Sequence, residues 1–179
     1  MRKNSLAFIL ILLMLTGSVA FSQQAAAIAP SSTDQKKLEK IHAMYQTYKK
    51  RAFPTAPDVT VEKLLQWEKA DSVVLLDVRS AKERRVSMIP KAISQKEFEK
   101  NIVKYRDRKI IVYCTIGYRS GKKVVKMRKK GLDAYNLIGG VLAWSHAGQF
   151  FSAPDGDPLR LHVYGKKWNL APGKYTAVW

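Results

Sequence analysis

The sequence predicts an α/β fold of three layers, in which helices cover both faces of a mostly parallel central sheet. Short apolar runs rich in β-branched residues alternate along the chain with segments of helical periodicity. Strands buried on both faces have such continuous apolar runs, and parallel strands need crossover connections, usually helices. The chain has 179 residues, 46% of them hydrophobic, which is enough for one compact domain with extra segments at its ends.

Residues 1–22 have the pattern of a signal peptide. Arg2 and Lys3 precede an apolar run over residues 6–15, and the small residue Ala20 follows at a suitable cleavage position. The run is shorter than the roughly 20 apolar residues of a membrane span, which favours a cleaved signal over an uncleaved anchor. We therefore expect an exported protein, periplasmic or secreted, with no stable membrane span after cleavage.

Residues 23–57 are expected to form a connector and an amphipathic helix. Ser32 and Gln35 have the spacing of a capping box. Apolar residues then recur at helical spacing up to about Lys50, namely Leu38, Ile41, Tyr45 and Tyr48. The two prolines of residues 53–57 break this pattern and mark a boundary.

Residues 58–150 contain the alternating elements of the expected domain. Helices are predicted over residues 61–69, 95–103, 121–130 and 141–146, and strands over residues 73–76, 109–113 and 134–137. Thr60 is a candidate N-cap of the first helix, and Gly131 is suited to end the third. Functional sites of parallel sheets form at the carboxyl ends of strands, which here lie just after Leu76 and Tyr113.

The charge and the cysteine count limit the partners and the chemistry. The formal net charge is +18 at pH 7, and the single cysteine excludes an intramolecular disulfide. A positive field favours small anionic substrates or envelope polyanions, while export argues against nucleic acid as a natural partner. The three histidines have no ligand spacing, so no metal site is expected at His42, His146 or His162.

The segment from Cys114 to Ser120 lies between a predicted strand and a predicted helix. Such a turn directs successive backbone N–H groups at one point, and Gly117 permits a bend that a Cβ would hinder. These groups would favour the thiolate form of Cys114, and Arg119 would add a positive charge for an anionic substrate. The pattern predicts an activated nucleophile, and the alternative is a buried structural cysteine.

Several motifs in order resemble the rhodanese family over residues 58–148. The run CTIGYRS at residues 114–120 is similar to the family's C-x-x-G-x-R-S loop, and LDVR at residues 76–79 matches its L-D-V-R. Glu83 and the NLIGG…W pattern of residues 136–144 also fit. The chain departs from the family at Ser87-Met88, which replace Gly-His, and at Lys91, which replaces Gly. We interpret these departures as structural drift.

The resemblance implies a rhodanese-like fold and a sulfurtransferase activity. Cys114 would take a sulfane sulfur from a small anionic donor such as thiosulfate and pass it to cyanide or a thiol, a protein thiol included. No metal or organic cofactor is implied. Asp77 and Arg79 either shape the pocket or form a structural ion pair. The substrate would be held by Arg119 and the rest of the loop, namely Thr115, Ile116, Gly117, Tyr118 and Ser120.

The same pattern fits functions other than that of an efficient sulfurtransferase. A persulfide carrier with low turnover and a non-catalytic binding module would both fit the same pattern. A cysteine phosphatase is disfavoured, because only four residues separate Cys114 from Arg119 where phosphatases have five. The extension over residues 151–179 is expected to cover apolar surface of the domain, with docking of a partner as the alternative.

Overall fold

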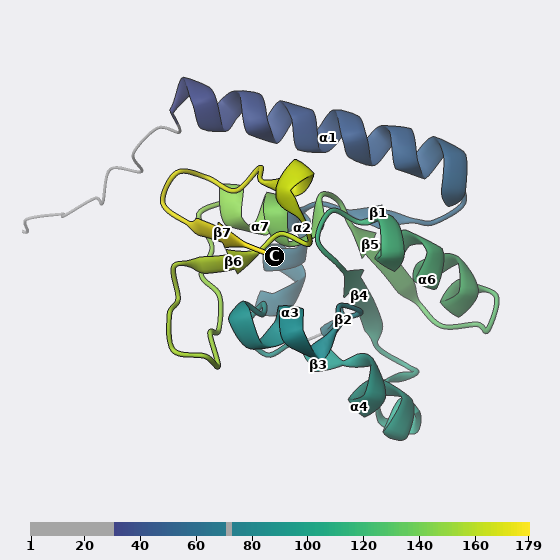
Figure 1. Ribbon diagram of the computed structural model, residues 1–179. Coiled ribbons are helices and arrows are strands. Elements are labelled where there is room, and N and C mark those ends of the chain that lie inside the picture. The colour runs from purple at the N-terminus through teal and green to yellow at the C-terminus, as the bar shows by residue number, and fades with distance from the viewer. Residues whose placement is uncertain (1–30, 71–72) are drawn as a thin grey trace, which may run out of the picture.

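The computed structural model describes residues 31–70 and 73–179, and the expected signal peptide lies outside them. Five strands form one sheet in the order β1-β5-β4-β2-β3, and each neighbouring pair is parallel (Figure 1). This confirms the predicted class. The strands are β1 (Asp58–Val59), β2 (Val73–Asp77), β3 (Ile93–Ser94), β4 (Lys109–Tyr113) and β5 (Ala134–Leu137).

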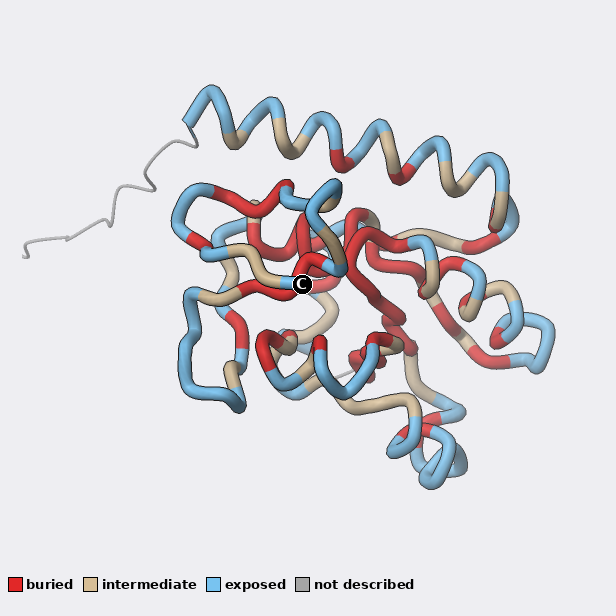
Figure 2. Tube along the Cα trace, in the orientation of Figure 1, coloured by how far each residue is buried: buried red, intermediate tan, exposed pale blue. Residues whose placement is uncertain are grey.

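Helices cover both faces of the sheet, as expected. The alternation along β4 separates the two cores, because Ile110 and Val112 face one and Ile111 and Tyr113 the other. Figure 2 shows the central strands as largely buried. The first core includes side chains of α4 (Gln95–Lys100), α5 (Ile102–Tyr105) and α6 (Tyr118–Arg128), and the second includes side chains of α2 (Val61–Lys69) and α7 (Gly140–His146).

The long helix α1 (Ser32–Ala52) lies against both α6 and α7 (Figure 1). It supplies Ile41 to one core and Tyr45 to the other. The predicted capping box at Ser32 is wrong, because the N-cap is Ser31, whose side chain accepts a hydrogen bond from the backbone N–H of Asp34. No helix among the described residues is both long and apolar enough to cross a membrane.

The predicted and observed helices differ most at Asn101 and at the start of α6, and the α-helix α3 (Ala81–Val86) was not predicted. The helix expected over residues 95–103 is divided at Asn101, whose side chain donates to the carbonyl of Glu97 and so caps α4. The helix α6 starts at Tyr118, earlier than expected. The helix α3 was missed, although Ser80 and Glu83 carry its capping box in the sequence.

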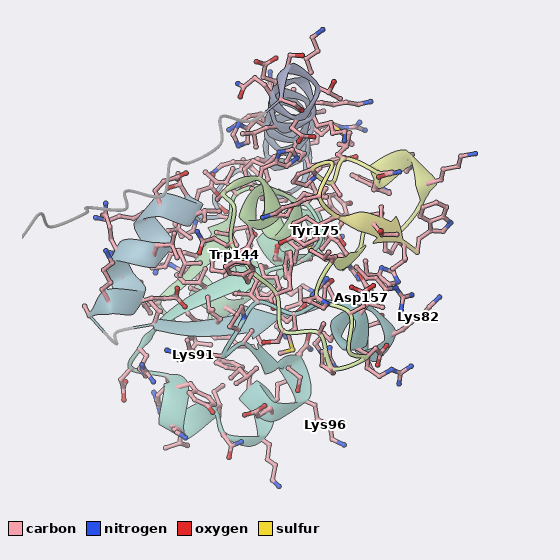
Figure 3. All side chains as sticks on the ribbon, turned by 90° about the vertical axis from the view of Figure 1, so that its left-hand side faces the viewer. Lys82, Lys91, Lys96, Trp144, Asp157 and Tyr175 are labelled. Carbon is pink, nitrogen blue, oxygen red and sulfur yellow. The ribbon has the colours of Figure 1, made fainter. Side chains whose placement is uncertain are left out.

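The C-terminal extension contributes to the second core. It contains β6 (Arg160–His162), η1 (Lys166–Trp168) and β7 (Thr176–Val178), and β6 packs against α3. Its buried side chains belong to the same cluster as Trp144, and Figure 3 shows Trp144 and Tyr175 inside the molecule. The expected domain boundary at residue 150 stays a prediction. The extension's side chains in this core are Phe151, Leu161, Val163, Leu170, Ala171 and Tyr175.

Two of the three residues interpreted as drift, Ser87 and Met88, contact the extension. Met88 and Ser152 exchange backbone hydrogen bonds of 2.9 and 2.8 Å. The hydroxyl of Ser87, which is buried, accepts a hydrogen bond from the backbone N–H of His162 at 3.2 Å. The departure from Gly-His therefore coincides with contacts between the domain and the extension.

Lys91 has a left-handed backbone conformation, with φ of 62°, where the rhodanese pattern has glycine. A Cβ is unfavourable there, so Lys91→Gly is expected to raise the free energy of unfolding by about 0.5–1 kcal/mol. Chemical denaturation measures the change. Lys91→Ala is the control, because it removes the charge but keeps the Cβ, and it should leave stability nearly unchanged. Equal effects of the two variants would contradict the backbone explanation.

Candidate active site

The sulfur of Cys114 lies where β4 ends and the loop before α6 begins. Its Sγ accepts hydrogen bonds from the backbone N–H of Gly117 at 3.2 Å and from the hydroxyl of Ser120 at 3.5 Å. Cys114 is only 2% exposed, yet it lines a pocket of about 280 Å³. The Cys114 sulfur therefore combines two hydrogen-bond donors with access to a cavity.

Gly117 gives the loop its bend and is held in place by Tyr45 of α1 and Asn136 of β5. Its φ is 100°, and a Cβ there would collide with the ring of Tyr45. The side chain of Asn136 donates to the carbonyl of Gly117 at 3.0 Å and lies 2.9 Å from the hydroxyl of Tyr45. Burial, followed by the carboxylate of Asp58, raises the pKa of Tyr45, so this hydroxyl stays a neutral donor to Asp58.

The first turn of α7 holds the start of the loop from the other side. The backbone N–H groups of Val141 and Leu142 donate to the carbonyls of Cys114 and Thr115 at 3.0 and 3.3 Å. A Cβ at Gly140 would collide with the Cys114 carbonyl oxygen, so only glycine allows this approach. The loop is thus fixed at both ends by residues distant in the sequence.

Arg119 is paired with Glu83 of α3. The two terminal nitrogens of the guanidinium lie 2.9 and 2.5 Å from the two carboxylate oxygens, and one of them is 3.3 Å from the hydroxyl of Thr115. Burial opposes ionisation of Glu83, but hydrogen bonds from Arg119 and Ser80 lower the pKa of this carboxyl from 4.5 to about 2. We expected Arg119 to hold an anionic substrate, and the structure places a protein carboxylate on it.

Asp77 and Arg79 form a buried ion pair of 2.8 Å, and neither lines the pocket of Cys114. Arg79 also donates to the carbonyl of Ser87. Burial would lower the pKa of Arg79, but the charge and hydrogen bonds of Asp77 raise it. Of the two roles considered, this geometry corresponds to the structural ion pair.

The pocket combines predicted and unexpected residues. Four predicted residues line it beside Cys114. Gly117 and Ser120 do not line it but donate hydrogen bonds to the Cys114 sulfur. Its remaining walls are Tyr48 of α1 and two aromatic residues of the extension, Tyr164 and Trp168. No local sequence signal marks these rings as site residues, because their proximity to Cys114 arises only from packing. The predicted lining residues are Thr115, Ile116, Tyr118 and Arg119.

The family model described as rhodanese-like domain matches residues 60–147. A protein named sulfurtransferase, from Allochromatium vinosum, is 30% identical over 93 residues, which are 48% of this chain and 84% of that protein. A tRNA uridine(34) hydroxylase from Corynebacterium kroppenstedtii is 29% identical over 120 residues, which are 61% of this chain but only 40% of that protein.

The fold also has a counterpart among solved structures. A thiosulfate sulfurtransferase from Pseudomonas aeruginosa aligns with a TM-score of 0.51 and 22% identity, over 63% of this chain and 22% of that one. At this identity the likeness concerns the fold. It supports the arrangement of sheet and helices described above.

Proposed function

Because the chain belongs to the rhodanese-like domain family, we propose that it is a sulfurtransferase that carries sulfur as a persulfide on Cys114 and acts after export. The observation that carries this proposal is the position of the Cys114 sulfur, which faces a pocket and accepts hydrogen bonds from Gly117 and Ser120. The sulfurtransferase of Allochromatium vinosum supports the same activity. The signal-like pattern of residues 1–22 supports a periplasmic or secreted location.

The proposed reaction has two half-reactions. The Cys114 thiolate attacks the outer sulfur of thiosulfate, the sulfur–sulfur bond of the donor breaks, and sulfite leaves with the bonding electrons. The Gly117 N–H and the Ser120 hydroxyl stabilise the negative sulfur before the attack. An acceptor, cyanide or a thiol, then attacks the outer sulfur of the persulfide and releases the Cys114 thiolate. Neither half-reaction uses a metal or an organic cofactor.

Treatment with thiosulfate is expected to add the mass of one sulfur atom to the protein, and Cys114→Ser is expected to abolish this gain. The serine hydroxyl is far less nucleophilic than a thiolate and cannot form a persulfide. Intact-mass spectrometry measures the addition. Circular dichroism of both proteins checks that the variant is folded.

The thiosulfate-treated protein also distinguishes an enzyme from a persulfide carrier and from a binding module. Thiocyanate formation with cyanide over many turnovers indicates an enzyme, and stoichiometric transfer indicates a persulfide carrier. A folded wild-type protein that gains no sulfur from thiosulfate or from an organic persulfide would instead be a binding module. Sulfur gain in Cys114→Ser would contradict the assignment of the nucleophile.

A further inference from the structure

We infer that the sulfur acceptor is an organic thiol with an aromatic or similarly flat apolar body, bound by the aromatic walls of the pocket. This inference rests on the proposed function and specifies its acceptor. Three of the lining rings, those of Tyr48, Tyr164 and Trp168, lie outside the matched residues 60–147. The part of the chain that matches the family model therefore does not supply them.

Rings from three separate elements form a continuous wall. The ring centroid of Tyr48 lies 5.3 Å from that of Tyr118 and 5.8 Å from that of Trp168. The Tyr48 and Tyr118 rings meet edge to face, at 68°. Aromatic contacts of this spacing hold ring faces in fixed positions, to which a further flat group can be added. The wall thus provides a surface for a ring beside the sulfur of Cys114.

Tyr164 also lines the pocket, and its backbone conformation is unfavourable. Its φ is 74°, which bulky side chains rarely adopt, and its N–H donates to the Nδ1 of His162 at 3.2 Å. The side chain is 59% exposed, so burial does not compensate for the strain. Its ring centroid is 5.1 Å from the guanidinium carbon of Arg119. Such strain is typical of functional positions, and here it places a ring at the pocket.

The charges of the pocket do not favour a small inorganic anion such as cyanide as the sulfur acceptor. Arg119 is the cation that lines the pocket, and it is already paired with Glu83 at 2.5 Å. The other lining side chains among the described residues are neutral, and most are apolar or aromatic. The pocket volume of about 280 Å³ is far larger than a cyanide ion needs. It approaches roughly 300 Å³, the lower end of the volumes of small-molecule binding pockets.

The transfer step balances with this acceptor. The acceptor thiolate attacks the outer sulfur of the Cys114 persulfide, a new sulfur–sulfur bond forms on the acceptor, and the bond to Cys114 breaks. Cys114 leaves as a thiolate, and the product is an organic persulfide. A ring packed against Tyr48 and Trp168 would hold the attacking sulfur near Cys114, which raises the rate through positioning.

The test uses single-turnover transfer from thiosulfate-loaded protein to benzylthiol or to ethanethiol, two neutral alkyl thiols that differ in the ring. Trp168→Ala is expected to lower the rate constant for benzylthiol about tenfold and to change that for ethanethiol less than about twofold. Each thiol is compared between the wild type and the variant, so the difference in intrinsic reactivity between the two thiols cancels. Loss of persulfide is followed by mass spectrometry.

Two further variants complete the design. Tyr164→Ala removes an exposed ring, which keeps the test informative if Trp168→Ala does not fold, and it should also affect benzylthiol selectively. Trp179→Ala is the matched control, because Trp179 is 53% exposed and does not line the pocket. An equal loss for both thiols, or no loss, would overturn the inference. Failure to load sulfur would instead overturn the proposed function.

Discussion

Deleting residues 152–179 is expected to leave a chain that does not fold. The segment buries Leu161 and Val163 completely, and Leu170 and Tyr175 almost completely, in the core that also contains Trp144. Each such side chain contributes about 1.5–3 kcal/mol through burial. The loss of four is comparable to the whole stability of a domain, which is about 5–15 kcal/mol. The absence of a cooperative unfolding transition would show the effect.

A single substitution tests the same claim within the full chain. Leu161→Ala is expected to lower the free energy of unfolding by about 2–5 kcal/mol, because it leaves a cavity in the core. Leu159→Ala is the control, since Leu159 is 54% exposed, and its effect should stay within about 0.5 kcal/mol.

For the deletion of residues 152–179, the contradicting result is a truncated protein that unfolds with the wild-type midpoint. It would show that the extension is only docked on a complete domain.

Glu83→Gln is expected to lower the free energy of unfolding by about 2–3 kcal/mol near neutral pH. The change removes the partner of Arg119 while the carboxylate site remains buried. The lowering of the Glu83 pKa to about 2 corresponds to about 3 kcal/mol, and the partial exposure of Arg119 reduces this figure. Chemical denaturation measures the difference between the two proteins.

The pH dependence of this difference has a defined sign. The pKa of Glu83 is lower in the folded protein than the usual 4.5, so its contribution is complete above that value and is lost as the pH falls towards about 2. The difference in free energy of unfolding between wild type and Glu83→Gln should therefore be constant near neutral pH and should approach zero in acid. Glu99→Gln, in an exposed pair with Lys123, should cost less than about 1 kcal/mol at every pH. A gap that widens in acid would refute the assignment.

The helix and strand pattern could be predicted where its signals are local. The run at residues 109–113 is β4, and Thr60 accepts from the N–H of Lys63 as an N-cap should. The division at Asn101 was missed because the apolar periodicity continues across it. The start of α6 was placed too late because Tyr118 and Arg119 belong at once to the loop motif and to the first turn.

The sequence by itself determined the α/β class, the parallel strands and the loop that carries Cys114, because these depend on periodicity and on residues a few positions apart. Only the tertiary structure decided what surrounds the sulfur. Arg119 meets a carboxylate 36 positions away, and the extension brings Trp168 beside Tyr48. Such contacts follow from the packing of whole elements. The residues next to such a ring or charge in the sequence carry no signal that packing places it beside the site.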